Sequence, residues 1–229
     1  MLIMHVNYKQ ELISLIANRS DILYTFLIRF VPLLINRLCN CTFFPWVYPP
    51  KIANKKTTMI KIKKAKVADV EVLALLGRLT WAESHGPYIS DKSDLAKYLD
   101  ENFSVGRTKQ NMSDPKQLYY IIYTDDLPVG YAKLIVQEGN ELLIPDNTCK
   151  LERIYILNDF IPLKIGKQLL AHVEAQAKAL QLGTMWLTVY IKNKRAIRFY
   201  ERNEFINVGV LNFLVSGKTY ENIVFSKKL

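Results

Sequence analysis

The pattern of hydrophobic and polar residues changes near Met59 and divides the chain into two parts. Residues 59–65 alternate apolar and polar side chains, which predicts a first β-strand. Asp69 then stands where it can cap a helix whose apolar residues recur at helical spacing from Val70 to Leu79. We therefore expect a folded domain over residues 59–229, preceded by an extension over residues 1–58 that is not part of it.

The same two periodicities predict further elements down the chain. In order, these are a helix over residues 90–103, a hairpin of residues 118–123 and 128–137 turning at Asp125-Asp126, a strand over 150–157, a helix from Ile165 ending near Gly183, a strand over 185–191, a short helix capped by Asn193, and strands over 205–215 and 219–225. The expected order is βααβββαβαββ. It predicts a mixed, mostly antiparallel sheet flanked by helices.

The extension contains an apolar stretch over residues 22–35. A membrane-spanning helix needs about 20 such residues with few charges, and Arg29 and Pro32 interrupt this one. No small-residue cleavage site follows, so a signal peptide is not supported either; contact with a membrane surface by residues 22–48 stays open.

Because Met59 is the first residue of the domain, we expect the native protein to begin there. An intact mass that included residues 1–58 would contradict this.

Cysteine usage and charge narrow the class of protein. The three cysteines, Cys39, Cys41 and Cys149, form no disulfide framework, which predicts a reduced, cytoplasmic protein. No histidine pair lies near Cys39 and Cys41, so no metal site is expected. The net charge is +10, and residues 1–58 contribute seven basic and two acidic side chains to it. This spread argues against a nucleic-acid-binding stripe and leaves an anionic membrane or a phosphorylated cofactor as the partner that the charge would suit. A monomer and a homodimer both remain open.

Two stretches of the domain resemble a known family. They read LERIYILNDFIPLKIGKQLL at residues 151–170 and LTVYIKNKRAIRFYERNEF at residues 187–205. The second matches the family's strand ending in Asn and helix with Ala-Ile-x-Phe-Tyr at these positions: Asn193, Ala196, Ile197, Phe199 and Tyr200. Residues 59–229 thus resemble the GNAT superfamily of acetyl-CoA-dependent N-acetyltransferases. The resemblance implies the GNAT fold, an α/β fold of the α+β type.

The resemblance also implies acetyl-CoA as cosubstrate and no metal. A strand that opens into a loop and a helix presents free backbone N–H groups to a pyrophosphate, and the strand's backbone can pair with the pantetheine amides. The residues implied in cofactor binding are Ile154, Tyr155, Ile156, Ile161, Pro162, Leu163, Lys164, Ile165, Gly166, Lys167, Asn193 and Arg198.

The sequence departs from the family pattern at two glycine positions. The family loop reads Gln or Arg, two residues, Gly, one residue, then Gly or Ala; here only Gly166 is kept and Lys164 replaces the first small residue. Glu204 stands where relatives usually have Gly. Positive charge can compensate for the missing glycine in binding the phosphates. The basic residues available for this are Lys164, Lys167 and residues 194, 195 and 198, which can instead be read as solvated residues on helix surfaces.

The implied acetyl transfer requires that the acceptor amine loses a proton and that the departing thiolate of CoA gains one. Tyr200 is the candidate acid for the departing thiolate, the alternative being a core tyrosine. The candidate bases are Glu152 and Glu83, although either can be a structural carboxylate and a water chain can replace both. His85 and His172 are weaker candidates, and His172 is expected to be exposed.

The acceptor follows from a second resemblance. Residues 80–86 and the helix after them are similar to the first helices of PaiA-type polyamine acetyltransferases. Five acids of this region can attract a polycation or form a solvated face: Glu83, Asp91, Asp94, Asp100 and Glu101. We expect acetyl transfer to a small primary amine, best represented by a polyamine. A protein or peptide amine, or a degenerate GNAT module with weak or no CoA turnover, are the alternatives.

Overall fold

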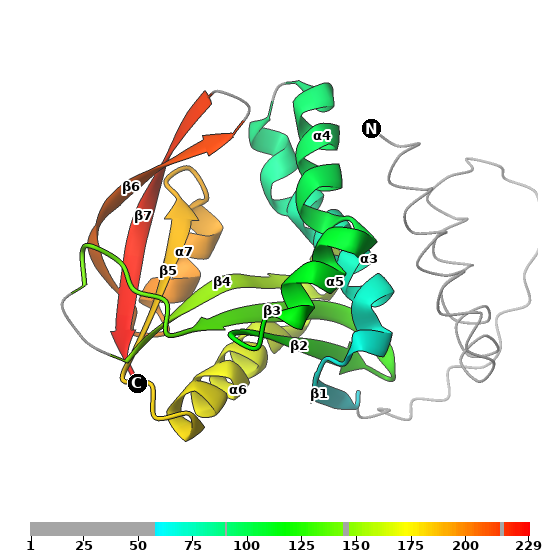
Figure 1. Cartoon of the computed structure of the whole chain (residues 1–229), viewed down its shortest axis with the longest axis horizontal. Coiled ribbons are helices and arrows are strands. Elements are labelled where there is room, and N and C mark those ends of the chain that lie inside the picture. The colour runs from blue at the N-terminus through cyan, green and yellow to red at the C-terminus, as the bar shows by residue number, and fades with distance from the viewer. Residues whose placement is uncertain (1–57, 90, 144–146, 216–217) are drawn as a thin grey trace, which may run out of the picture. The chain divides into compact units, whose positions relative to one another are not determined.

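A seven-stranded sheet forms the centre of the part of the chain that the structure describes (Figure 1). In this computed structural model the described residues are 58–229 except 90, 144–146 and 216–217. Residues Ile60–Leu229 form a compact unit. The expectations for residues 1–57, including membrane contact by residues 22–48, lie outside the described residues.

The strands are mostly antiparallel, as the sequence predicts. They are β1 (Ile60–Lys64), β2 (Gln117–Thr124), β3 (Leu127–Val136), β4 (Thr148–Ile156), β5 (Thr184–Tyr190), β6 (Ile206–Val215) and β7 (Lys218–Lys228), in the sheet order β1-β2-β3-β4-β5-β7-β6. Asp125 and Asp126 have φ of 49° and 66°, the left-handed backbone that a two-residue hairpin turn requires. This turn brings β2 and β3 into register as expected.

Helices cover both faces of the sheet. They are α3 (Val70–His85), α4 (Lys92–Phe103), α5 (Val105–Ser113), α6 (Ile165–Ala179) and α7 (Lys194–Glu201), with 3₁₀ turns η1 (Val67–Asp69), η2 (Gly86–Tyr88) and η3 (Asn158–Leu163). Helices α3 and α5 pack on one face of the sheet and α6 on the other (Figure 1). Gly77 allows α3 and α4 to cross closely, because a Cβ there would collide with the Phe103 ring.

Three local predictions were wrong, and a fourth, the cap at Asp69, is confirmed in position but not in its bond. The observed order contains one helix, α5, more than the expected order βααβββαβαββ. Ser104 ends α4, and its hydroxyl accepts from the Arg107 N–H and so caps α5. Helix α5 is mostly polar, so its sequence shows no helical spacing of apolar residues. Asp69 occupies the N-cap position of α3 as expected, but its carboxylate accepts from the Lys66 N–H and makes no capping bond to the helix. Helix α6 ends before Gly183, with Gln181 taking the left-handed backbone at φ 59°. His172 is half-buried, with its ring edge-on to Tyr120.

The parallel strands β4 and β5 pair over only three positions. The last pair is Lys150 with Trp186, yet β4 continues to Ile156 and β5 to Tyr190. Beyond this point the two strands separate, so one edge of β4 lacks a strand partner there. This gap opens the middle of the sheet and positions the site.

A β-bulge lies in β4 where the separation begins. Lys133 of β3 pairs with Arg153 and Leu134 pairs with Leu151, so Glu152 is the extra residue between them. A bulge bends the strand and redirects its side chains. As a result Glu152 and Arg153, although adjacent in sequence, both approach Lys133.

Candidate active site

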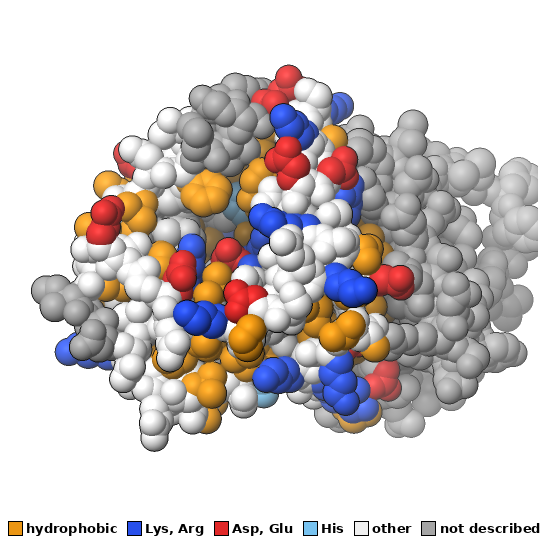
Figure 2. Space-filling view, in the orientation of Figure 1, with side chains coloured by type: hydrophobic (Ala, Val, Ile, Leu, Met, Phe, Trp, Pro, Cys, Tyr) orange, Lys and Arg blue, Asp and Glu red, His pale blue; other side chains and the backbone are white. Residues whose placement is uncertain are grey.

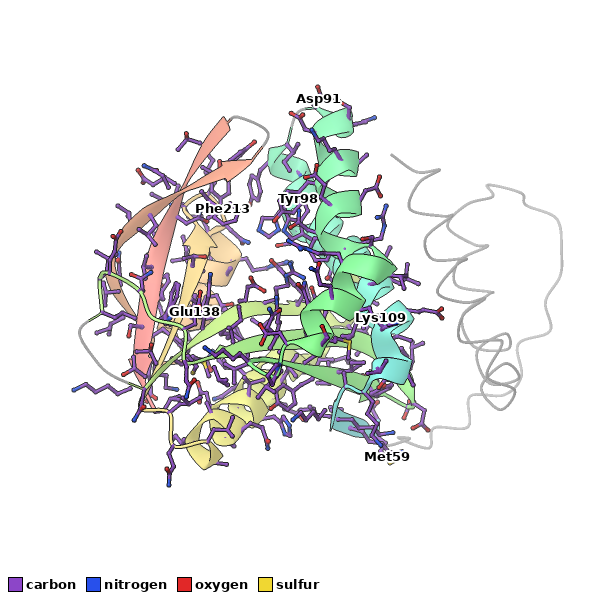
Figure 3. The ribbon with its side chains drawn as sticks, viewed as in Figure 1. Met59, Asp91, Tyr98, Lys109, Glu138 and Phe213 are labelled. Atoms are coloured by element: carbon purple, nitrogen blue, oxygen red, sulfur yellow. The ribbon has the colours of Figure 1, made fainter. Side chains whose placement is uncertain are left out.

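A cavity of about 760 Å³ occupies the gap between β4 and β5. Its walls come from β4, β5, the helices α3, α4, α6 and α7, and the β6–β7 hairpin. Hydrophobic side chains gather around the hollow between α4 and this hairpin (Figure 2). Tyr98 of α4 and Phe213 of β6 lie on facing sides of its mouth (Figure 3). The cavity therefore joins segments that are far apart in sequence.

One end of the cavity is strongly cationic. We call it the basic end, formed by Lys164, Lys167, Arg195, Arg198 and Arg202 around the first turn of α6 and along α7. Gly166 lies here in the first turn of α6, and a Cβ built on it would come no closer than 3.8 Å to Ile156. The missing side chain thus leaves space beside the helix N-terminus, where backbone N–H groups favour an anion.

Two side chains stand in strained backbone near this end. Lys164, the residue before α6, has φ 57° and ψ 21°, and Glu204 after α7 has φ 69°. Both are positions that favour glycine, because a Cβ in left-handed backbone costs about 1–2 kcal/mol. The chain keeps the left-handed backbone at both places without the glycine.

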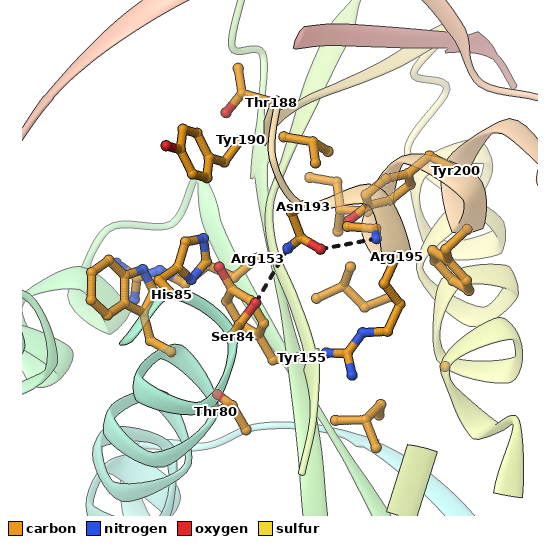
Figure 4. A pocket seen from close by; sticks show the side chains of 18 of the residues that line it. Thr80, Ser84, His85, Arg153, Tyr155, Thr188, Tyr190, Asn193, Arg195 and Tyr200 are labelled. Carbon is orange, nitrogen blue, oxygen red and sulfur yellow. Dashed lines mark hydrogen bonds between the residues drawn. The ribbon is translucent and has the colours of Figure 1, made fainter. Parts of the chain in front are cut away.

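The short helix α7 is fixed by Asn193. The Asn193 side chain accepts a hydrogen bond from the Ala196 N–H at 3.1 Å, as the sequence predicts for a cap. Its Nδ2 also donates to Ser84 Oγ of α3 at 3.5 Å, and both bonds are visible in Figure 4. Asn193 therefore connects opposite walls of the cavity and fixes the position of α7.

Tyr200 projects from α7 into the cavity wall. Its ring is buried and packs edge-on against Phe199 and Phe205. Burial raises the pKa of the Tyr200 phenol above its ordinary value. The hydroxyl therefore stays protonated at neutral pH and can donate a hydrogen bond or a proton.

The other end of the cavity is aromatic. We call it the aromatic end, formed by Trp81, Tyr88, Tyr98, Tyr190 and Tyr220. The Trp81 ring stacks on Tyr98 with centroids 4.2 Å apart, and Tyr190 lies edge-on to Tyr88 and Tyr220. The Tyr88 hydroxyl donates to the Lys192 carbonyl at 3.3 Å. This end can surround an apolar group on several sides.

The sequence profile of the Acetyltransferase (GNAT) family matches residues 79–205, more than half of the chain, and spans both ends of the cavity. The chain belongs to the GNAT acetyltransferase family. It is an acyl-CoA-dependent N-acetyltransferase, as the resemblance of its sequence predicts.

Individual GNAT relatives agree with this assignment. The chain is 27% identical over 143 residues to an uncharacterized N-acetyltransferase of Lactobacillus delbrueckii subsp. lactis, covering 62% of this chain and 82% of the relative. It is 25% identical over 150 residues to the spermidine N(1)-acetyltransferase of Thermoplasma acidophilum, covering 64% of this chain and 88% of the relative. The crystal structure of the PaiA N-acetyltransferase of Thermoplasma acidophilum with coenzyme A shares the fold, with a TM-score of 0.59 at 23% identity, over 75% of this chain and 99% of that one.

Most of the residues implied in cofactor binding meet in the GNAT cavity. Those that line it are Ile154, Tyr155, Ile156, Ile161, Lys164, Gly166, Lys167, Asn193 and Arg198. Pro162, Leu163 and Ile165 do not; Ile165 is fully buried and Leu163 is exposed to solvent. Of residues 161–167, the segment implied in pyrophosphate binding, Ile161, Lys164, Gly166 and Lys167 therefore line the cavity.

The two candidate bases have different surroundings. Glu152 lines the cavity, with Lys133 Nζ 2.5 Å from its Oε2. Burial acts to raise the pKa of the Glu152 carboxyl, but Lys133 and Arg153 outweigh it and hold the pKa below its ordinary value, which makes Glu152 a weaker base. Glu83 does not line the cavity; its Oε2 accepts from the Asn158 N–H at 2.8 Å.

The remaining acids of the expected polycation site lie elsewhere. Asp91, Asp94, Asp100 and Glu101 do not line the cavity. Asp91 caps α4 at the Ser93 N–H, at the far end of the helix (Figure 3), and Asp100 pairs with Arg78 at 2.7 Å. Among the described lining residues Glu152 is the one carboxylate.

Sequence reasoning missed Arg153 and most of the aromatic end, and ranked His85 low. The His85 ring lies in the cavity wall, stacked on Trp81 with centroids 4.7 Å apart. Burial lowers its pKa to about 4, offset in part by a hydrogen bond with the Trp81 backbone, so it is neutral at pH 7. Trp81 and His85 are four residues apart on one helix, and this spacing could have indicated that their side chains lie together. No pattern in the sequence indicated that Tyr190 and Tyr220 would join them.

Among the described residues, no helix has the length and apolar character needed to cross a membrane. The same residues contain no group of three or more histidine, cysteine or acidic side chains arranged to hold a metal ion.

Proposed function

We propose that this GNAT enzyme transfers the acetyl group of acetyl-CoA to a primary amine, with the cofactor entering at the basic end and the amine at the aromatic end. The observation that carries the proposal is the separation of β4 from β5 after Lys150 and Trp186. It leaves a free strand edge inside a cavity whose two ends differ in chemistry. An extended amide chain can add to such an edge as an extra strand.

The residues present fit the cofactor. The edge of β4 at Ile154 and Ile156 suits the pantetheine amides, and the first turn of α6 at Gly166 and Lys167 suits the pyrophosphate. Arg198 adds positive charge from α7. Lys164 supplies a charge at a place where relatives have a small residue.

The reaction needs one nucleophilic attack and two proton movements. The neutral amine attacks the thioester carbonyl carbon, and a backbone N–H of β4 stabilises the oxyanion that forms. The carbon–sulfur bond then breaks and the thiolate takes a proton, for which Tyr200 is the donor we propose. The attacking nitrogen loses its proton to water or to a carboxylate. Of the two candidates, only Glu152 lines the described cavity, and its lowered pKa favours the water route.

A polyamine is a second, narrower candidate for the acceptor. It is supported by the 25% identity to the spermidine N(1)-acetyltransferase of Thermoplasma acidophilum. A polycation would need carboxylates around it, and the described lining offers only Glu152, which is already paired with Lys133. A peptide amine remains an alternative within the same chemistry.

The test uses the full chain and two readouts. Calorimetry measures acetyl-CoA binding, and a thiol reagent measures CoA release with spermidine, spermine, amino acids and a lysine peptide. Binding together with release for at least one amine supports the proposal. No acetyl-CoA binding and no release with any amine would contradict it and favour a degenerate GNAT module.

A further inference from the structure

Arg153 is a nearly buried cation in the cavity wall whose side chain has a neutral hydroxyl, that of Tyr131, as a hydrogen-bond partner and no carboxylate within hydrogen-bond distance in the described part of the chain. Its side chain is 14% exposed, and the distance from its Nε to Glu152 Oε2 is 3.9 Å, too long for a hydrogen bond. The guanidinium carbon lies 4.3 Å from the centre of the Phe103 ring. The guanidinium, which carries five N–H donors, thus lies against an aromatic ring and lines the cavity.

The charges around Arg153 do not balance. Glu152 already holds Lys133, whose side chain is only 4% exposed. One carboxylate therefore serves two buried cations, and Lys150 is a third cation that acts on the same carboxylate. Tyr131 and Tyr119 lie near enough to interact electrostatically with the guanidinium, and the Tyr131 side chain is also its hydrogen-bond partner, but neither phenol carries a charge that would balance it. A buried charge left without a partner is costly, so this cluster is suited to an added anion.

Arg153 lies on the acceptor side of the cavity rather than at the basic end. The β-bulge at Glu152 turns Arg153 toward α4, where it interacts with Tyr98 of the aromatic end. Figure 4 shows it beside His85 and Tyr155, across the cavity from Asn193 and Tyr200. An anion bound here would belong to the acceptor and not to the phosphates of the cofactor.

We propose that the acceptor amine also carries a carboxylate, which Arg153 binds. The planar fork of a guanidinium matches a carboxylate with two parallel hydrogen bonds. This inference rests on the proposed function and narrows it to an amino-acid-like substrate, in which amine and carboxylate belong to one small molecule.

The aromatic end indicates the third part of that substrate. Trp81, Tyr88 and Tyr190 offer ring surface to an apolar side chain, and no carboxylate of the described lining is free to hold a second ammonium group. An amino acid with an aromatic or aliphatic side chain fits both features. A polycation fits neither.

The experiment compares matched acceptors that differ only in the carboxylate, using the full chain and CoA release. The pairs are phenylalanine with phenethylamine and tyrosine with tyramine, and spermidine is a further arm. The carboxylated member should have the higher kcat/KM, by about tenfold to a hundredfold for a charged two-point hydrogen bond. Arg153→Met should abolish this preference while leaving the KM for acetyl-CoA unchanged.

A matched control replaces another largely buried arginine. Arg78 of α3 is 18% exposed, pairs with Asp100 and does not line the cavity; Arg78→Met should keep the preference. Arg153→Lys, which keeps the charge but loses the fork, should retain part of it. These variants separate recognition of the carboxylate from a general loss of packing.

Binding to the unaltered protein gives an independent readout if Arg153→Met fails to fold or turnover is not seen. N-acetylphenylalanine should bind at least about tenfold more tightly than N-acetylphenethylamine. Equal binding, or equal or better acetylation of the amines without a carboxylate, would overturn the inference and leave the acetyltransferase proposal standing. Failure of acetyl-CoA to bind would instead overturn the proposed function.

Discussion

The carboxylate of Glu83, in the last turns of α3, accepts a hydrogen bond from the backbone N–H of Asn158 at 2.8 Å. Asn158 is the first residue of η3, the turn that leads from β4 to the N-terminus of α6. The bond thus ties helix α3 to the turn between β4 and α6, and we propose that the amine and the cofactor bind on these two sides of the cavity. Glu83, chosen from the sequence as a possible base, occupies a place suited to positioning.

Substitutions at Glu83 distinguish positioning from base catalysis. Glu83→Ala removes the acceptor and should raise the KM for acetyl-CoA about tenfold, the effect of losing one charged hydrogen bond. Glu83→Gln keeps an acceptor oxygen and should restore most of that loss. If Glu83 is the base, both variants will lower kcat and alter its pH profile while the KM for acetyl-CoA stays the same.

Tyr200→Phe tests the proton donor. The variant keeps the buried ring and removes only the hydroxyl, so kcat should fall about a hundredfold, the low end of general acid contributions, with acetyl-CoA affinity near normal. Tyr120→Phe is the matched control, because Tyr120 is equally buried but lies outside the cavity lining. Unchanged turnover in Tyr200→Phe would remove this residue from the mechanism.

Lys164 has a strained, left-handed backbone and a positive charge that we propose helps to bind the cofactor, and two substitutions separate these two properties. Lys164→Gly should stabilise the fold by about 1 kcal/mol, because glycine accepts left-handed backbone at no steric cost. Lys164→Ala keeps the strain. Both lose the charge and should raise the KM for acetyl-CoA alike, measured beside thermal unfolding.

Glu204→Gly is the control for Lys164. Glu204 also has left-handed backbone but does not line the cavity, so its replacement should stabilise the fold without changing the KM for acetyl-CoA. An unchanged KM in both Lys164 variants would show that this lysine does not contribute to cofactor binding.

His85 should make stability depend on pH. Burial lowers its folded pKa to about 4 from 6.5, so between these values the unfolded chain binds a proton that the folded chain does not. Its contribution is therefore complete above about pH 6.5 and is lost as the pH falls toward 4, with about 2 kcal/mol lost between pH 7 and pH 5. Urea unfolding of the wild type and of His85→Gln at both pH values measures this. An equal pH dependence in the two proteins would contradict the prediction.

The sequence by itself determined the family, most elements and the starts of helices α6 and α7. Period-two and helical spacing located all seven strands, since each strand and helix buries one face or both. Asn193 was readable as a cap because its side chain bonds a backbone N–H three residues away. Such local bonds are fixed by short-range geometry. Helix α5 was not predicted, because it is mostly polar and buries little of its surface.

Only the tertiary structure decided which side chains share the cavity and in what charge state. The early end of the β4–β5 pairing and the bulge at Glu152 depend on how strands far apart in sequence align. They pair Glu152 with Lys133 and leave Arg153 with no carboxylate within hydrogen-bond distance among the described residues. The sequence showed five acids in or beside helices α3 and α4, but the tertiary arrangement places all five, Glu83, Asp91, Asp94, Asp100 and Glu101, outside the cavity lining and brings tyrosines of β5 and β7 to it instead. Electrostatics at a site depends on three-dimensional distance and desolvation, which periodicity along a chain does not encode.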